Sequence, residues 1–282
     1  MGTLYLVATP IGNLEDLTLR AIRILKQVPL IAAEDTRTAR KLLSHLDIHT
    51  PITSYFEHNE EAKLDAILSA LEAGDVAVIS EAGMPGLSDP GAKLVQAAIA
   101  HEIRVVPIPG ANAVIIALVA SGLPTDQFVY LGFLPRERKP RRALLESVAH
   151  EMRTLVAFES PHRVREALAD IEKSLGNRSM CVARELTKLH EEFLRGRVSE
   201  LSAHFEANEP RGEFTLVIAG AETSAEAKDR VEWTDTDVRI RLEKFLTEGL
   251  TPTEAAKRVA REAGWERRVI YQMAVEHKRK IK

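Results

Sequence analysis

Short apolar runs of strand length recur through the first half of the chain, and each is followed by a segment with helical spacing. Residues 3–8, 30–33, 76–79 and 104–108 are runs of this kind. Runs that stay apolar without alternation are typical of strands buried on both faces of a parallel sheet. The helical segments between them predict right-handed crossovers. The first half is therefore predicted to be a parallel sheet covered by helices, with a last strand at 128–133.

The second half spaces its strand-length runs differently, at 154–158, 180–183, 192–195 and 214–219. Helices are expected after the first and the third of these runs. The interval between the second and third runs is too short for a crossover helix, and strands joined so closely pair in the antiparallel sense. The pattern therefore predicts a mixed, partly antiparallel sheet.

Three short helical segments end the chain, after a small, polar and acidic stretch that is typical of a linker. A three-helix unit with a tight glycine turn, here Gly264 before Trp265, resembles a helix-turn-helix that docks on DNA or RNA. Units of this size also serve as protein-interaction domains. The predicted organisation is an N-terminal α/β domain, a second α/β domain, a linker and the helical module, at residues 1–134, 135–220, 221–233 and 234–282.

The composition is that of an ordinary soluble protein. The chain has 282 residues, a net charge of −3 and one cysteine, Cys181. A single cysteine excludes a disulfide framework and a multi-cysteine zinc site, and no apolar run approaches the roughly 20 residues that span a bilayer. No signal peptide is visible, so a cytoplasmic location is expected. The last 26 residues hold nine Lys and Arg against three Asp and Glu. The predicted basic face consists of Arg267, Arg268, Lys278, Arg279, Lys280 and Lys282.

The loop at residues 80–91 is the stretch around which the predicted site is organised. It follows a buried strand and contains three glycines and two prolines. Ligands of open α/β sheets bind beyond the carboxyl ends of the strands, and glycines let the backbone approach them closely. The chain contains neither the Gly-x-Gly-x-x-Gly fingerprint nor a Walker A sequence. The two commonest nucleotide-binding loops therefore lose support.

Charged residues also follow other predicted strands. These clusters are Glu34, Asp35 and Arg37; Glu159, His162 and Arg163; and Arg184, Glu185 and Lys188. Simpler roles stay open for several of these residues. Asp35 or Thr36 can cap the following helix, Asn59 can cap the helix from residue 60, and the later clusters can be internal ion pairs.

A basic segment, residues 135–142, joins the two halves and carries five basic residues against one acidic residue. Such a segment is suited to contact phosphates, here through Arg138 and Arg141. A solvated linker is the equally ordinary alternative.

Six motifs in this order resemble the ribosomal RNA small subunit methyltransferase I family, which has the tetrapyrrole-methylase fold. They are TPIGNL at 9–14, AEDTR at 33–37, HNE at 58–60, SEAGMPGLSDPG at 80–91, ESPHR at 159–163 and ARELTK at 183–188. The resemblance runs over essentially the whole chain. It implies transfer of a methyl group from S-adenosylmethionine to the ribose 2′-hydroxyl of a cytidine in 16S rRNA of the small ribosomal subunit. It also implies a homodimer, no membrane partner, and a cofactor held between the two α/β domains.

The resemblance further implies roles for individual residues. The cofactor pocket is expected to include Pro10, Ser80, Glu81, Ala82, Gly83, Met84, Pro109, Gly110, Asn112, Ala113, Phe158 and Leu186. The residues expected nearer the RNA are Asp35, Arg37, His58, Asn59, Ser160, His162, Arg163 and Glu185. The chain departs from the family at three places that bear on cofactor contacts. The family usually has Asp at position 81, Thr at position 84, and a Pro-Gly-Pro-Ser turn where this chain has Pro109-Gly110-Ala111-Asn112.

A ribose hydroxyl is a weak nucleophile, so a base or a cation beside the developing alkoxide would help the transfer. Our hypothesis is that Glu159 or Glu34 accepts the proton while Lys188 or Arg184 stabilises the charge, and no metal-ligand cluster is seen. Two other functions stay open: a tetrapyrrole methyltransferase on the same fold, and a non-catalytic nucleic-acid-binding regulator built on the helix-turn-helix. The basic segments favour RNA over a small macrocycle, and the regulator leaves the charged motifs at the strand ends unexplained.

Overall fold

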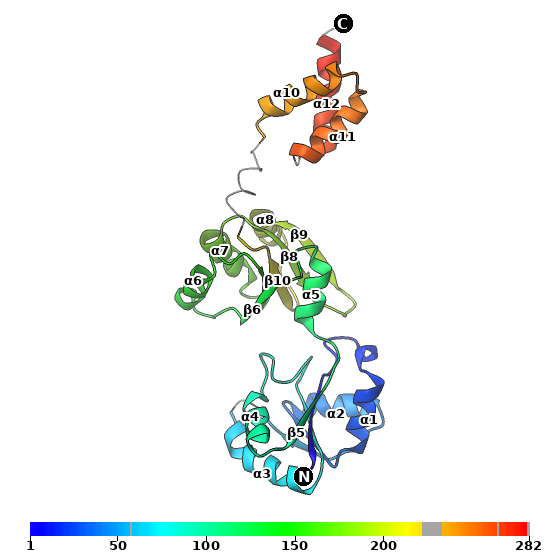
Figure 1. Cartoon of the computed structure of the whole chain (residues 1–282), viewed down its shortest axis with the longest axis vertical. Helices are drawn as coiled ribbons and strands as arrows, with labels where there is room; N and C mark the ends of the chain where they lie inside the picture. Colours follow the sequence, from blue (N-terminus) through cyan, green and yellow to red (C-terminus); the bar gives the residue numbers. More distant parts are fainter. Residues whose placement is uncertain (57, 222–232, 264, 281–282) are drawn as a thin grey trace. The chain divides into compact units, whose positions relative to one another are not determined.

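The computed structural model describes residues 1–56, 58–221, 233–263 and 265–280. The chain divides into two compact units, Met1–Ala221 and Glu222–Lys282. The first unit contains two five-stranded sheets, and the described part of the second contains three helices (Figure 1). The predicted fold class, a parallel sheet and a mixed sheet followed by a three-helix module, is confirmed.

The first sheet is parallel throughout, as the apolar runs predict. Its strands are β1 (Thr3–Val7), β2 (Leu30–Ala33), β3 (Ile52–Ser54), β4 (Val76–Ile79) and β5 (Arg104–Ile108), in the order β3-β2-β4-β1-β5. Every residue of β4 is buried because this strand lies at the centre of the sheet with helices on both faces. The carboxyl ends of all five strands share one edge, and the predicted site loops leave from this edge.

Two pairs of helices cover the first sheet. The helices α1 (Leu19–Gln27) and α2 (Thr36–His45) pack on one face, and α3 (Glu60–Ala73) and α4 (Ala92–Ala100) pack on the other (Figure 1). On the first face Leu25 and Leu43 lie against Ile31 and Ile79, and on the second Leu71 and Leu94 lie against other core residues of the strands. Because helices cover both faces of the sheet, side chains on both sides of each strand are buried, and the strand sequences show no alternation of apolar and polar residues.

The second sheet is mixed, as the strand spacing predicts. Its strands are β6 (Phe128–Phe133), β7 (Thr154–Glu159), β8 (Ser179–Arg184), β9 (Glu192–Arg197) and β10 (Phe214–Ile218), in the order β6-β7-β10-β8-β9. The pair β6 and β7 is parallel, and the other three pairs are antiparallel. The helices α6 (Arg138–Ser147), α7 (Val164–Leu175) and α8 (Val198–Ala207) pack on one face, and α5 (Ala113–Ser121) packs on the other beside buried Cys181.

The prediction that the strand at 128–133 closes the first sheet is wrong. That strand is β6, and it is the edge strand of the second sheet, with Phe128 opposite Thr154. The helix before it, α5, already buries Val114 and Leu118 against the second sheet, so the chain has left the first sheet by this point. An apolar run of strand length does not show which sheet it joins.

Two local predictions also differ from the structure. The sequence between the first two strands predicts one helix from about Leu14 to Gln27. In the structure Leu14–Asp16 is a short 3-10 turn, and α1 begins only after Thr18, whose side chain accepts a hydrogen bond from the Ala21 N–H. The basic segment expected as a loop or linker contains the start of α6.

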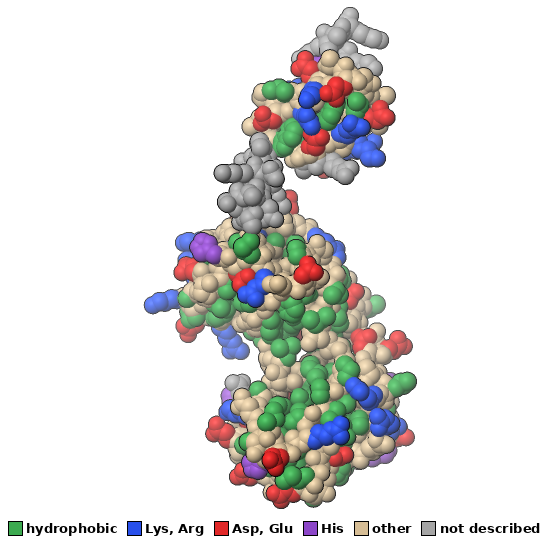
Figure 2. Space-filling view, viewed as in Figure 1, with side chains coloured by type: hydrophobic (Ala, Val, Ile, Leu, Met, Phe, Trp, Pro, Cys, Tyr) green, Lys and Arg blue, Asp and Glu red, His purple; other side chains and the backbone are tan. Residues whose placement is uncertain are grey.

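The second unit has a small core of its own. The helices α10 (Asp235–Thr247), α11 (Pro252–Ala263) and α12 (Arg267–Lys280) enclose residues such as Leu242, Val259 and Ile270. Figure 2 shows basic and acidic side chains interspersed on the visible face of this unit. The predicted linker falls mainly on 222–232, which lie outside the described residues, as do the side chains of 278–282. No helix in the described ranges is long and apolar enough to cross a membrane.

Candidate active site

The loops that follow β1 and β4 are joined by a pair of backbone hydrogen bonds. The Thr9 N–H donates to the Gly83 carbonyl at 2.8 Å, and the Gly83 N–H donates to the Thr9 carbonyl at 3.1 Å. The Ser80 hydroxyl also donates to the Gly83 carbonyl, at 3.1 Å. Gly83 has a φ of +82°, and a Cβ there would lie 3.3 Å from Ile11 Cγ2. A glycine is therefore needed where the two loops cross.

The motif after β2 supports these loops. Glu34 Oε2 accepts a hydrogen bond from the Glu81 N–H at 2.9 Å, so this carboxylate fixes the start of the β4 loop. Asp35 caps α2 by accepting from the N–H groups of Arg37 and Thr38, which is the simpler of its two predicted roles. The Arg37 side chain bonds the same carboxylate and, with the Arg37 N–H, lowers the pKa of Asp35 to about 2.

Asp89 is a carboxylate in the loop after β4 to which the sequence motifs assigned no separate role. Burial and the nearby charge of Glu34 raise the pKa of Asp89 to about 7, although the Ser80 hydroxyl acts in the opposite direction and Glu81 adds a smaller upward effect. A carboxyl that titrates near neutral pH beside two others is a group to consider for proton transfer. The signal in the sequence was only a second acidic residue, after Glu81, in a loop rich in glycine and proline.

The HNE motif holds the far end of the same loop. Glu60 is buried, and its Oε1 accepts a hydrogen bond from the Gly91 N–H at 3.0 Å, at the start of α4. Asn59 occupies the N-cap position of α3 without a side-chain cap, and its Oδ1 accepts from the Phe56 N–H instead. His58 is exposed beside the ring of Phe56. The structure therefore gives Glu60, rather than His58, the closer tie to the loop.

The ESPHR motif is largely internal, which weakens the role predicted for Glu159 as a base. The Glu159 side chain is 0% exposed, and one of its oxygens, Oε1, accepts from Arg163 at 2.7 Å and from the Ser160 N–H at 2.7 Å. The Arg163 guanidinium also donates to the Leu134 carbonyl at 3.2 Å. Burial raises the pKa of Glu159. Oε1 is therefore committed to holding the loop after β7, where His162 remains exposed, while Oε2 has no hydrogen-bond partner among the described residues.

The cations of the RELTK motif, residues 184–188, have carboxylate partners. Lys188 Nζ lies 2.9 Å from Glu185 Oε1 and 3.0 Å from Glu213 Oε2, while Arg184 Nε donates to Glu192 at 3.0 Å. Burial alone would lower the pKa of Lys188, but the hydrogen bonds to the two carboxylates outweigh it and raise the pKa. These cations are already neutralised, which weakens their predicted role beside an alkoxide.

The loops of the two sheets meet at Gly12. A Cβ on Gly12 would collide with Lys188 Cγ and lie 2.9 Å from Thr187 Oγ1, a buried hydroxyl without a partner among the described residues. On the β4 loop, the Ser88 hydroxyl lies 2.7 Å from the Tyr130 hydroxyl of β6. Side chains from both sheets also share one apolar cluster, which includes Ile11, Leu87, Val114, Phe158 and Leu186.

The structure therefore brings together residues that were predicted to hold the cofactor. A Cβ on Gly83 would lie 3.7 Å from the Ala111 carbonyl, and a Cβ on Gly110 would lie 2.8 Å from Ala8 Cβ. The loops that follow β1, β4 and β5 therefore approach one another closely. The Asn112 side chain is occupied in part, because its Oδ1 caps α5 by accepting from the Ile115 N–H at 3.2 Å. That these residues contact a cofactor stays a prediction.

The prediction that Arg141 contacts phosphate is wrong. Its side chain is 0% exposed and lies between α6 and α7, where it pairs with Asp170 at 2.8 Å and with Glu166 at 3.2 Å. Asp170 also accepts from Arg142 at 2.6 Å and from Arg138 at 3.4 Å. Arg138 remains mostly exposed, and its RNA contact stays a prediction.

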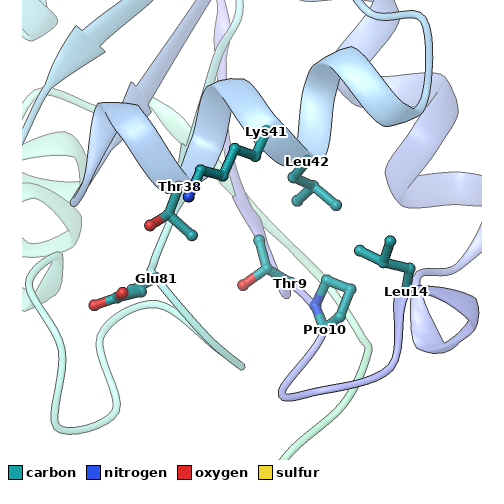
Figure 3. Close-up of a pocket in the computed structure, with 7 residues that line it drawn as sticks. All are labelled: Thr9, Pro10, Leu14, Thr38, Lys41, Leu42 and Glu81. Carbon is teal, nitrogen blue, oxygen red and sulfur yellow. The ribbon is translucent and has the colours of Figure 1, made fainter.

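A pocket of about 200 Å³ opens beside α2 (Figure 3). Its lining residues are Thr9, Pro10, Leu14, Thr38, Lys41, Leu42 and Glu81. Only Pro10 and Glu81 belong to the predicted site, and the α2 residues were missed because the sequence of α2 has the pattern of an ordinary amphipathic helix.

Comparison with known proteins identifies relatives over the whole chain. A family model described as tetrapyrrole (corrin/porphyrin) methylases matches residues 3–202. The protein named ribosomal RNA small subunit methyltransferase I from Synechocystis is 49% identical over 278 residues, or 98% of each chain. Proteins of the same name from Halalkalibacterium halodurans and Bacillus subtilis are 48% and 42% identical, and each match covers 96% of this chain and 93% of the relative.

Solved structures resemble part of the chain at much lower identity. A uroporphyrin III C-methyltransferase from Thermus thermophilus has a TM-score of 0.53 at 20% identity, over 77% of this chain and 97% of that chain. The same Thermus thermophilus enzyme has also been solved in complex with S-adenosylhomocysteine. A cobalt precorrin-4 methyltransferase has a TM-score of 0.57 at 16% identity, over 77% of this chain and 94% of that chain. At these identities the likeness shows the fold alone.

Proposed function

Because the chain belongs to the tetrapyrrole methylase family, within the branch named ribosomal RNA small subunit methyltransferase I, we propose that it methylates RNA of the small ribosomal subunit with S-adenosylmethionine as methyl donor. The finer proposal is methylation of the ribose 2′-oxygen of a cytidine in 16S rRNA. We propose a cytoplasmic location on the same ground, because the proposed substrate is a ribosomal subunit.

The observation that carries this proposal is the extent of the similarity. The rRNA methyltransferase relatives match 96–98% of the chain and therefore include the C-terminal helices. The solved tetrapyrrole-pathway enzymes match only 77%. A small macrocycle has no phosphates, whereas the phosphates of RNA can bind the basic side chains of an additional unit. The extra unit therefore favours RNA as substrate.

The loops between the two sheets fit the proposed cofactor. Half-buried Phe158 and buried Leu186 offer apolar surface suited to an adenine ring, and the exposed loop at Glu81 and Ala82 offers backbone groups suited to polar atoms. When bound, S-adenosylmethionine supplies a methyl group on a positively charged sulfur. The residues of the chain then hold the RNA hydroxyl in line with that methyl group, and positioning of this kind supplies most of the acceleration.

Asp89 and Glu34 are the candidates for the group that accepts the hydroxyl proton. Asp89 ionises near neutral pH, where a general base works best. Glu34 is partly committed, because its Oε2 holds the Glu81 N–H. We favour Asp89.

Asp89→Asn is expected to reduce kcat by at least about 100-fold while cofactor binding stays intact. Glu34→Gln is the comparison, and an equal loss of cofactor binding in Asp89→Asn would contradict its role as base.

We also propose that the protein is a homodimer. The outward side of α5 exposes Ile115 and Val119, one helical turn apart, and Leu189 of the RELTK loop is 93% exposed. Exposed apolar side chains of this size are typical of interaction surfaces. Sedimentation of the wild type and of Val119→Glu tests this, because loss of a dimer in the variant is expected.

The decisive test of the main proposal is methyl transfer from labelled S-adenosylmethionine to small ribosomal subunits isolated from cells that lack the gene. Mass spectrometry then maps the labelled nucleotide. Label on one ribose 2′-oxygen of a cytidine is the expected result. Absence of label together with cofactor binding would overturn the RNA substrate and direct the search to tetrapyrroles.

A further inference from the structure

We infer that the pocket beside α2 binds one nucleotide of the RNA substrate, with Lys41 at a phosphate and the apolar side chains against the base. This inference rests on the proposed function and adds the place where the RNA strand enters. It concerns three α2 residues, Thr38, Lys41 and Leu42, to which neither the motifs nor the comparisons assign a role.

The pocket has an apolar end and a polar end. Pro10, Leu14 and Leu42 gather on one side, and Thr38, Lys41 and Glu81 lie toward the other (Figure 3). A nucleotide has the same division, because the faces of its base are apolar while its edges and its phosphate are polar. The apolar end offers surfaces on which a base can pack, and the polar end offers hydroxyl, ammonium and carboxylate groups.

Lys41 and Glu81 give the polar end of the pocket its charges. Among the residues that the structure describes, neither Lys41 nor Glu81 forms an ion pair within 4 Å, so both remain able to bind a ligand. The Lys41 ammonium attracts a phosphate, and this attraction is why we assign the phosphate of the nucleotide to Lys41. Glu81 can accept a hydrogen bond from an exocyclic amine of a base.

Size leads to the same assignment. The pocket measures about 200 Å³, whereas pockets that enclose drug-sized ligands measure about 300–1,000 Å³. A complete cofactor with its adenosine and methionine portions falls in the larger class. One base with part of its sugar is the portion of the proposed reactants that the pocket suits.

The position of the pocket fits the reaction. Pro10 and Glu81 belong both to the pocket lining and to the loops predicted to hold the cofactor, so a nucleotide in the pocket lies next to those loops. None of the seven lining residues comes from α5 or from the RELTK loop, which border the apolar cluster on the other sheet. The α2 side therefore presents the RNA, and the second-sheet side faces the cofactor.

The test compares Lys41→Met with Arg40→Met, which removes a positive charge from the neighbouring exposed position of the same helix without touching the pocket. Binding of small ribosomal subunits is measured by filter retention with S-adenosylhomocysteine present. Methyl transfer gives KM and kcat, and calorimetry gives the affinity for S-adenosylhomocysteine. Lys41→Met is expected to weaken subunit binding and raise KM by about tenfold, the size expected when a charged hydrogen bond is removed. Arg40→Met is expected to change both by less than about twofold, and Lys41→Arg is expected to restore binding.

One further variant and the contrary outcomes complete the test. Thr38→Val, which keeps the shape of the side chain, is expected to raise KM by a few-fold with kcat unchanged. Unchanged subunit binding in Lys41→Met, or an equal loss in Arg40→Met, would overturn the inference. Weakened S-adenosylhomocysteine binding in Lys41→Met would overturn it in favour of a cofactor pocket. If the wild-type protein transfers no methyl group to subunits, the proposed function fails, and the filter-retention comparison still decides whether Lys41 binds RNA.

Discussion

Gly12 lies where a loop of the first sheet presses against the RELTK loop of the second. Since a Cβ there would collide with Lys188 Cγ and crowd Thr187 Oγ1, Gly12→Ala is expected to force the loops apart. Overpacking of this kind costs about 1–3 kcal/mol. Urea unfolding should show this loss of stability, and cofactor affinity should fall because the loops on both sides carry predicted contacts.

A double-mutant cycle makes this prediction specific. Lys188→Ala removes the Cγ atom that the new methyl group would strike, so Gly12→Ala should cost less stability in that background than in the wild type. Equal costs in the two backgrounds would show that the contact at Gly12 is not the source of the effect.

Asp89 gives a pH dependence whose sign follows from its pKa. The pKa is about 7 in the folded protein against an ordinary value of 3.8, so the folded state holds the proton more tightly. Ionisation of Asp89 therefore lowers the stability progressively as the pH rises from about 4 to 7. Asp89→Asn, which cannot ionise, should be more stable than the wild type at pH 8 by about 1–2 kcal/mol after solvent screening, and closely similar at pH 4.

Chemical unfolding at the two pH values measures this difference. Asp65→Asn removes an exposed carboxylate from α3 and serves as the matched control. A stability gain for Asp89→Asn that is the same at pH 4 and pH 8 would contradict the argument, because it would not come from ionisation.

At the scale of elements, α6 and α7 are joined through the Asp170 carboxylate. It accepts hydrogen bonds from Arg138, Arg141 and Arg142, and Arg141 is completely buried. Asp170→Asn leaves a buried guanidinium with a weakened partner, and breaking a buried pair in this way costs about 3–5 kcal/mol. Glu166→Gln acts on the same arginine from a side chain that is 70% exposed, so it should cost less than about 1 kcal/mol. Thermal unfolding of both variants checks the contrast, and similar losses would contradict it.

Secondary-structure elements were predictable where the local sequence alone determines them. The buried run of β4, the cap residue Asp35 and the short interval between β8 and β9 each have a local physical cause, so the sequence predicts them. The sheet that β6 joins depends on where α5 packs, which is a tertiary choice. Likewise, the burial of Arg141 depends on Asp170, which lies 29 residues away, and the sequence around Arg141 looks like that of surface charges. Glu159 pairs with Arg163 only four residues on, which is the internal ion pair that the sequence left open for this cluster.

The site was predictable in its loops and less so in its individual roles. Motifs at the strand ends identify the loops because parallel strands bring their carboxyl ends to one edge. Within them, the sequence does not distinguish a carboxylate that titrates near pH 7, such as Asp89, from one that supports a backbone N–H, such as Glu34. Burial and hydrogen-bond partners make that difference.

At the scale of the whole molecule, the first unit forms its cores without help from the second. The four apolar clusters of residues 1–221 contain no residue beyond Ile218, and the helices α10–α12 enclose a separate cluster. The first unit is therefore expected to fold alone. Removal of residues 222–282 should leave the affinity for S-adenosylhomocysteine within about twofold, as measured by calorimetry.

Removal of the second unit is expected to act on RNA binding instead. The exposed Arg267 and Arg268 at the start of α12 form no ion pair within the described part of the chain, so they remain able to contact phosphates. Each phosphate that the protein no longer binds reduces the slope of log affinity against log salt by about 0.7–0.9. The truncated protein should therefore bind small ribosomal subunits more weakly, with a shallower salt dependence measured by filter retention between about 50 and 200 mM salt.

Arg267→Gln with Arg268→Gln in the full chain should reproduce part of both changes, because the helix remains while its charges are gone. An unchanged salt slope in the truncated protein would show that the unit supports the structure or binds another protein, and that the RNA contacts lie entirely in the first unit.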